Sequence, residues 1–207
     1  MSRLTVWGQR RSSNVQKVLW SLEELGLDFE RIDVGAEFGR LREPAYLALN
    51  PNGLVPTLED GDTVLWESNA IVRYLFAKYG TDPMYPRDFG RRARADGWCD
   101  WATTTLWAQV RPLLLQLTRT PEPERNQREI EGALAAANRA LAILDGELEL
   151  ESYVAGAQFS FGDIPLGVAA QRWFRLPVAR ASAPHVDAWY ARIQARPAFQ
   201  RWVDAPA

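Results

Sequence analysis

Residues 50–71 read NPNGLVPTLEDGDTVLWESNAI, and this stretch decides the fold of the first part of the chain. After an opening Asn-Pro-Asn-Gly turn come two runs of β-forming residues, 55–59 and 63–66, joined through Asp-Gly-Asp. This spacing predicts a β-hairpin. From Ser68 the apolar residues recur at helical intervals up to Gly80, which predicts a helix directly after the second strand.

The residues before this stretch add a strand, a helix and a second strand. Residues 4–7 and 29–34 are rich in β-forming side chains, and the apolar residues between them follow a helical period. Ser12 or Ser13 suits the N-cap of that helix, and Gly26 suits its end. This order predicts a right-handed βαβ unit. Together with the hairpin, it predicts a mixed four-stranded sheet with helices on its faces.

The remainder of the chain has almost no strand signals. Residues 81–90 contain the prolines and aspartates of a linker, and helical periodicity dominates after them. We therefore expect a domain at residues 1–80, a linker at 81–90 and an all-helical domain at 91–207. Pro112 is expected to kink or end the first helix of that second domain. Helices are predicted around residues 91–117, 130–148, 163–171 and 184–195.

The composition argues against several classes of function. The 207 residues carry 24 basic and 26 acidic side chains, so a partner nucleic acid is not expected. The apolar runs are far shorter than the ~18 residues of a membrane span, and the N-terminus lacks the pattern of a secretory signal. We therefore expect a cytoplasmic protein with no membrane partner. Cys99 and His185 are the only residues of their kinds, which leaves no CxxC pair and too few ligands for a zinc site. Any sulfur chemistry is expected to use the sulfur of a ligand.

Four motifs, in this order, resemble those of the soluble, cytosolic glutathione S-transferase family, and within it the bacterial theta-like and nu-like groups. They are Ser12–Val18, Asn50–Leu58, Trp66–Ile71 and Ser160–Ile164. The resemblance implies an α/β thioredoxin-like N-terminal domain followed by an all-α C-terminal domain, the glutathione transferase fold. It also implies an enzyme that binds glutathione as co-substrate, stabilises its thiolate and transfers it to small apolar electrophiles, as in detoxification.

The resemblance further implies a homodimer, with residues 68–73 and the helix near 91–105 at the interface. It implies no metal.

Val55 and Pro56 are expected to bind the cysteinyl part of glutathione. In the family the corresponding proline follows a cis peptide bond, and the backbone of the residue before it pairs with glutathione like an added strand. The alternative is an ordinary edge-strand proline without a ligand.

Glu67 and Ser68 stand where a strand ends and a helix begins, a place where free N–H groups and the helix dipole favour an anion. Ser68 is expected to donate to the γ-glutamyl carboxylate and Glu67 to accept from the γ-glutamyl ammonium. The alternative is that Ser68 only caps the helix. Leu54 stands where many relatives have a Lys or Gln that contacts the glycyl carboxylate, so Asn52 is the expected substitute.

Ser12 is the candidate for activating the thiol, because a hydroxyl that donates to sulfur favours the nucleophilic thiolate. Asn14 falls where nu-like members carry an Asn whose amide also reaches the sulfur, and Ser13 is a third candidate. The alternative for Ser12 is a purely capping role.

The second substrate is expected to bind between the domains. An aromatic lining suits apolar electrophiles, and Trp101, Thr105 and Trp173 are the candidates for it. Ser160 and Asp163, by contrast, match the N-capping box of a core helix, so a structural role is expected for them.

Two alternative functions stay open. Asn14 in the nu-like position also fits a glutathione-dependent disulfide or peroxide reductase, in which two glutathione molecules react in turn. Leu54 weakens the glycyl subsite, which also fits a non-catalytic binding module with the glutathione transferase fold.

Overall fold

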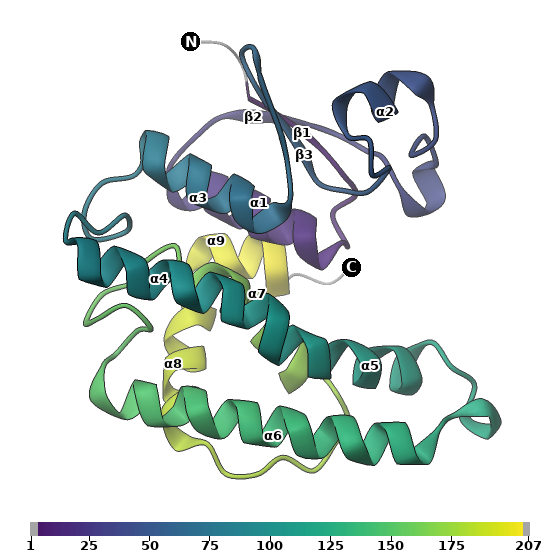
Figure 1. Cartoon of the computed structure of the whole chain (residues 1–207), viewed down its shortest axis with the longest axis vertical. Coiled ribbons are helices and arrows are strands. Elements are labelled where there is room, and N and C mark those ends of the chain that lie inside the picture. The colour runs from purple at the N-terminus through teal and green to yellow at the C-terminus, as the bar shows by residue number, and fades with distance from the viewer. Residues whose placement is uncertain (1–3, 205–207) are drawn as a thin grey trace. The chain divides into compact units, whose positions relative to one another are not determined.

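The computed structural model describes residues 4–204 and divides into two compact units (Figure 1). The first unit runs up to Tyr85 and includes residues 196–204, and the second spans Pro86–Ala195. The elements of the first unit are β1 (Leu4–Trp7), α1 (Ser13–Glu24), β2 (Phe29–Ile32), η1 (Ala36–Phe38), α2 (Pro44–Leu49), β3 (Thr57–Asp60), β4 (Thr63–Trp66), α3 (Ser68–Tyr79), α9 (Pro197–Phe199) and η4 (Gln200–Asp204). Those of the second are α4 (Phe89–Trp101), η2 (Ala102–Leu106), α5 (Trp107–Thr118), η3 (Glu122–Glu124), α6 (Gln127–Leu150), α7 (Asp163–Phe174) and α8 (Pro184–Gln194).

The four strands form one mixed sheet in the order β2-β1-β3-β4. β1 is parallel to β2 and antiparallel to β3, and β3 and β4 form the predicted hairpin. Thr57 lies opposite Trp7 on one side and opposite Trp66 on the other. This register brings the loop before β3 to the same end of the sheet as the start of α3, which follows β4.

Helices α1 and α3 pack side by side on one face of the sheet (Figure 1). Val18 of α1 and Ile71 of α3 are fully buried against Leu58 of β3. The apolar stripes that predicted both helices therefore form the core of this unit.

Two strand boundaries in this unit differ from the predicted ones, and one helix was not predicted; each difference has a local cause. β2 ends at Ile32 because its partner strand β1 ends at Trp7, the residue opposite Ile32. β3 begins at Thr57 because Pro56 has no N–H to donate to the ladder. Between β2 and β3 the chain forms α2, which begins with Pro44, a residue that suits the first position of a helix.

The last described residues, 196–204, group with the first unit and not with the helical domain expected at 91–207. Phe199 is fully buried, and its ring meets that of Trp20 edge to face with 5.0 Å between centroids. Arg196 donates two hydrogen bonds, of 2.7 and 2.6 Å, to the carboxylate of Glu24. The end of the chain is thus bound to α1.

In the second unit, α4, η2 and α5 form one continuous helical run. Pro112 lies inside α5, and the helix does not end there but continues to Thr118. The irregular part is η2, a π-helical turn one to two turns before the proline. A proline removes the hydrogen bond to the carbonyl four residues before it, which here is that of Ala108 inside α5.

The long helix α6 buries the stripe that its sequence predicts. Its N-cap Asn126 accepts a hydrogen bond from the N–H of Glu129 at 3.1 Å. Leu134 is only half-buried, whereas the other members of the stripe are buried: Ile130, Ala137, Leu141, Leu144 and Leu148. Among residues 4–204, no helix combines the length and apolar composition that crossing a membrane requires.

Ser160 and Asp163 interact before and at the start of α7, but they form only half of the predicted capping box, because the N-cap is Gly162 and the Ser160 hydroxyl donates to Asp163 Oδ2. The fully buried Asp163 carboxylate accepts from the Ser160 N–H at 2.9 Å and from Trp189 Nε1 at 3.0 Å, and the Val154 N–H donates to it at 3.2 Å. Burial raises the pKa of Asp163 to about 6, although these donors act in the opposite direction. Its partners are structural, which agrees with the role expected for it.

Candidate functional site

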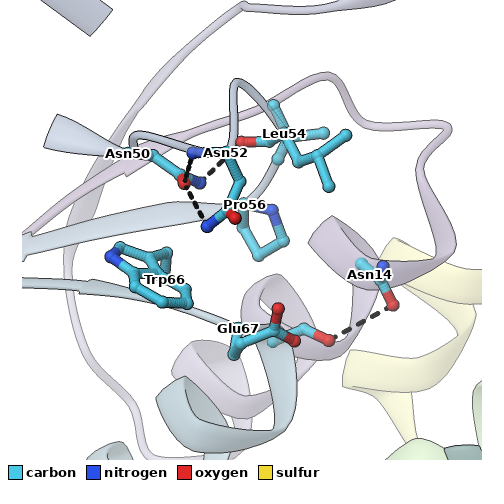
Figure 2. A pocket seen from close by; sticks show the side chains of 9 residues that line it. Asn14, Asn50, Asn52, Leu54, Pro56, Trp66 and Glu67 are labelled. Atoms are coloured by element: carbon cyan, nitrogen blue, oxygen red, sulfur yellow. Dashed lines mark hydrogen bonds between the residues drawn. The ribbon is translucent and has the colours of Figure 1, made fainter. Parts of the chain in front are cut away.

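A polar pocket lies in the first unit where the loop before β3, the end of β4 and the first turns of α1 and α3 meet (Figure 2). Its lining combines amide, carboxylate and hydroxyl groups with apolar side chains. The lining residues are Asn14, Asn50, Asn52, Leu54, Val55, Pro56, Trp66, Glu67 and Ser68. In residues 4–204, no three His, Cys, Asp or Glu side chains are grouped as a metal site would require.

Val55 and Pro56 form one wall of this pocket. The peptide bond between them is cis, as the sequence led us to expect. Because pairing of β3 begins at Thr57, the main chain of Val55 lies beyond the β ladder. The side chain of Val55 packs against the apolar core of the unit. Val55 is therefore anchored by its side chain, while its main chain follows the edge of the pocket.

A network around Asn50 fixes the loop that precedes Val55. Asn50 Nδ2 donates to the carbonyl oxygen of Leu54 at 2.8 Å, and Asn50 Oδ1 accepts from both nitrogens of Asn52 at 3.1 Å. Tyr46 donates to the same carbonyl at 2.6 Å, and burial raises the pKa of its hydroxyl. The Leu54 side chain itself is 61% exposed, so it offers an apolar surface at this end of the pocket.

Glu67 has a backbone conformation that is rare for a residue with a side chain. Its φ is 71° and its ψ 109°, and it is the N-cap of α3, although its side chain makes no capping hydrogen bond. Residues held in such regions are frequent at binding sites, where the surrounding structure compensates the strain. The turn leaves the Glu67 carboxylate on the pocket and buries Ser68, the first residue of α3, to 6% exposure. The N–H groups of the first turn of a helix attract anions.

Asn14 connects this helix start to α1. Its Oδ1 accepts from Ser68 Oγ at 3.2 Å (Figure 2), and it also accepts from Lys17 Nζ at 3.1 Å. The two helix starts on the pocket are thus linked by side chains as well as by packing.

The three candidates for thiol activation occupy successive positions. Ser12 is the N-cap of α1 with extended backbone, and its half-buried side chain makes no capping hydrogen bond to the first turn. Ser13 is the first residue of α1 and is half-buried. Asn14 is exposed, and of the three it alone is among the lining residues of the pocket. The hydroxyl of Ser12 is therefore not used to cap the helix.

The candidates for the second-substrate site all lie in the helical unit. Trp101 is the last residue of α4, and its ring packs edge to face against that of Trp98, with 4.9 Å between the ring centroids. Thr105 is half-buried within the π-helical turn η2. Trp173 is only 1% exposed, so its indole lies in the apolar core of this unit.

Asn50 and Trp66 are pocket residues that the sequence analysis did not single out. Asn50 stands in the Asn-Pro-Asn-Gly turn, and its role as a hub of hydrogen bonds requires the folded loop. Trp66 is the last residue of β4, is 41% exposed and lines the pocket beside Glu67.

The mixed four-stranded sheet places the cis Pro56, Glu67 with its positive φ and Ser68 at the start of α3 on one pocket. A helical unit follows this sheet in the chain, as in the glutathione transferase fold. Family models agree: the glutathione S-transferase N-terminal domain matches residues 2–76, and the C-terminal domain matches residues 101–197. The chain belongs to the glutathione S-transferase family.

Particular relatives are similar over nearly their whole length. Glutathione S-transferase GstB of Escherichia coli is 42% identical over 98% of this chain and 99% of its own. Glutathione S-transferase 3 of Zea mays is 35% identical over 99% of this chain and 95% of its own. The theta-class glutathione S-transferase of Xanthomonas axonopodis pv. citri, solved with glutathione bound, is 48% identical with a TM-score of 0.93, covering 100% of this chain and 99% of its own.

Proposed function

We propose that this glutathione transferase binds glutathione across the pocket of its first unit and transfers the thiolate to small apolar electrophiles. In this proposal the main chain of Val55, beside Pro56, pairs with the cysteinyl backbone. Ser68 and the N–H groups of the first turn of α3 bind the γ-glutamyl carboxylate, and Glu67 accepts from the γ-glutamyl ammonium. The supporting observation is that the Val55–Pro56 wall, the left-handed Glu67 and the start of α1 share one pocket. The relative from Xanthomonas that was solved with glutathione bound adds support.

The thiol end of glutathione is proposed to lie against the start of α1. A thiol with a pKa of ~8.5 is mostly protonated at neutral pH, and hydrogen-bond donors together with a helix N-terminus lower that value. Ser12 is the proposed donor, since its hydroxyl is not engaged in capping. Asn14, whose amide lines the pocket, is the second, and Ser13 the third.

The glycyl end is proposed to lie near Asn52. Leu54 offers no donor from its exposed side chain, whereas the Asn52 side chain lines the pocket and is oriented by Asn50. The glycyl carboxylate would then contact a neutral amide. Most of the electrostatic recognition of glutathione would therefore occur at its γ-glutamyl end.

For the electrophile, the helical unit supplies aromatic and hydroxyl side chains. Trp101 and Thr105 are partly accessible and are proposed to contact an apolar substrate, whereas Trp173, the third candidate, is only 1% exposed and is not part of this proposal. We propose that the enzyme acts as a cytoplasmic homodimer in detoxification, with residues 68–73 and 91–105 at the interface. Light scattering after gel filtration tests the dimer.

A glutathione-dependent reductase is a second candidate, and the position of Asn14 on the pocket favours it. The two functions separate in parallel assays with an aromatic halide and a small disulfide. If the enzyme transfers the thiolate, the halide should be the better substrate. If only the disulfide is turned over, the transferase proposal fails and the reductase proposal takes its place. Absence of binding of S-methylglutathione in calorimetry would overturn both.

A further inference from the structure

Lys17 is one of only two lysines in the chain, and its side chain is 8% exposed next to the pocket. It lies on α1, and its Nζ donates to Asn14 Oδ1 at 3.1 Å and to Ser68 Oγ at 3.3 Å. The first turn of α3 supplies a further acceptor, Asn69 Oδ1, at 3.1 Å. Burying an ammonium group is costly unless its N–H groups make hydrogen bonds. Oxygens in the first turns of two helices, α1 and α3, accept hydrogen bonds from the Lys17 ammonium.

The ammonium determines which way the Asn14 amide faces. An ammonium group donates and never accepts, so the side of the amide that meets Lys17 must be its oxygen. The hydroxyl of Ser68 donates to the same oxygen at 3.2 Å, which Figure 2 shows as the dashed line from Asn14. With Oδ1 held by two donors, the NH2 group of Asn14 is directed away from them, and Asn14 is a lining residue of the pocket. The donor end of the amide is therefore turned away from Lys17 and Ser68.

The same ammonium adds positive charge at the start of α3. A serine hydroxyl has one proton to donate, so when Ser68 binds a carboxylate it gives up its bond to Asn14 Oδ1, which Lys17 then holds alone. A carboxylate oxygen that accepts from Ser68 Oγ lies about 2.7 Å from it, and is therefore within about 6 Å of Lys17 Nζ. Opposite charges at this separation attract strongly where the surroundings are only partly hydrated. The positive end of the α3 dipole acts in the same direction.

We propose that Lys17 is a positioning residue that couples the two ends of bound glutathione. It holds the Asn14 amide with its NH2 group toward the thiol, and through Ser68 it attracts the γ-glutamyl carboxylate. The inference rests on the placement of glutathione proposed above. It predicts that the affinity for the carboxylate and the ionisation of the thiol both depend on this one buried cation.

Three variants test this coupling. Lys17→Met keeps most of the apolar stem and removes the ammonium, and Lys17→Arg restores the charge and the donors. Lys78→Met is the matched control, because it removes the other lysine, which binds Asp60 at 2.7 Å and does not line the pocket. Calorimetry with S-methylglutathione, which has the carboxylate but no free thiol, is expected to show about tenfold weaker binding for Lys17→Met. Lys17→Arg should recover most of this loss, and Lys78→Met should bind as the wild type does.

The thiol end has its own readout. The pH at which bound glutathione becomes thiolate, followed by its ultraviolet absorbance, is expected to rise in Lys17→Met and to return toward the wild-type value in Lys17→Arg. A role confined to packing would not move this pH.

A measurement on the unaltered protein decides the case if Lys17→Met does not fold. Protein labelled only in its lysines gives two side-chain NMR signals, one from Lys17 and one from Lys78, and Lys78→Met assigns them. On saturation with S-methylglutathione the Lys17 signal should shift and the Lys78 signal should not.

The outcomes separate this inference from the proposed function. If S-methylglutathione does not bind the wild type, the proposed function fails. If it binds while the Lys17 signal stays in place, or if Lys17→Met binds it as tightly as the wild type does, only the role of Lys17 is overturned. The role of Lys17 is also overturned if Lys17→Met and Lys17→Arg both lose affinity while the Lys17 NMR signal of the wild type does not shift. That result would mean that Lys17 contributes only by packing.

Discussion

Ser12, Ser13 and Asn14 follow one another at the start of α1, and the proposed reaction depends on which of them reaches the sulfur. We predict that Ser12→Ala lowers kcat/KM with an aromatic halide about 10²-fold, the usual effect of losing one donor to a developing anion. The pKa of the bound thiol should rise, because the thiolate loses a hydrogen bond. Steady-state kinetics and thiolate absorbance measure the two effects.

Ser13→Ala and Asn14→Ala test the two other candidates in the same assays, and both should lower kcat/KM less than Ser12→Ala does. If Ser12→Ala reacts as fast as the wild type and Asn14→Ala does not, the role belongs to Asn14.

Glu67 allows the backbone and the carboxylate to be tested separately. Its φ of 71° is costly for a residue with a Cβ, by about 1–3 kcal/mol, whereas glycine adopts it freely. Glu67→Gly should raise the free energy of unfolding by about 1 kcal/mol, since the greater freedom of the unfolded glycine chain offsets part of the relief. It should also weaken glutathione binding, because the acceptor for the γ-glutamyl ammonium is lost.

Glu67→Gln keeps the strained backbone and removes only the charge, so it should weaken binding without the gain in stability. Urea denaturation and calorimetry on the pair give both numbers. A loss of stability in the glycine variant would show that the left-handed conformation is not strained.

At this scale the sequence predicted the pocket residues that belong to recognisable motifs. Val55 follows from the family motif around Pro56, and Glu67 and Ser68 follow from the family motif together with a helix start. Lys17 and Asn50 could not be found in this way, because their roles are hydrogen bonds. Lys17 meets Ser68 across 51 positions of the chain, and no local pattern contains that distance.

Among the elements, the β3–β4 hairpin is fastened to α3 through one carboxylate. Asp60 Oδ2 accepts from Tyr74 at 2.8 Å, from Lys78 at 2.7 Å and from Tyr79 at 2.7 Å. Burial acts to raise the pKa of Asp60, but these hydrogen bonds, that from Lys78 foremost, outweigh it and hold the pKa below its usual 3.8.

Because this pKa is lowered on folding, the stabilisation it brings is complete above about pH 4 and is lost as the pH falls through the folded-state value. Asp60→Asn should therefore lower the free energy of unfolding at pH 7 by about 1–3 kcal/mol. The difference from the wild type should shrink on acidification. Denaturation curves across the acid range measure it, with Asp62→Asn, an exposed carboxylate in the same turn, as control. A difference that stays constant with pH would exclude an ionic role for Asp60.

Elements with strong local signals were predicted well, and those set by their neighbours were not. Helices α1 and α3 have apolar stripes and end close to Gly26 and Gly80, and the hairpin has its Asp-Gly-Asp turn. The end of β2 is set by the length of β1, and α5 continues through Pro112 although a proline disfavours a helix interior. Such boundaries depend on pairing and packing that a single stretch of sequence does not contain.

For the chain as a whole, the largest departure from the sequence-based division is the return of residues 196–204 to the first unit. Arg10 donates to the carbonyl oxygen of Arg201 at 2.6 Å, and its guanidinium lies 5.3 Å from the centroid of the Trp202 ring. Since Arg10 belongs to the turn that leads to Ser12, the end of the chain braces the segment proposed to hold the thiol. The partners of these contacts are separated by about the full length of the chain, so the sequence alone does not reveal them.

A substitution at Phe199 best tests how the end of the chain stabilises α1. It is fully buried against Trp20, so Phe199→Ala should cost about 3–4 kcal/mol of stability from the lost packing and the cavity left behind. Arg201→Ala, which removes an exposed ion pair with Glu23, should cost less than about 1 kcal/mol. Hydrogen exchange locates the effect: in Phe199→Ala the amides of α1 should lose more protection than those of α6, because the two helices belong to different compact units. Equal losses in α1 and α6 would mean that the chain unfolds as one cooperative body and that the brace stabilises all of it.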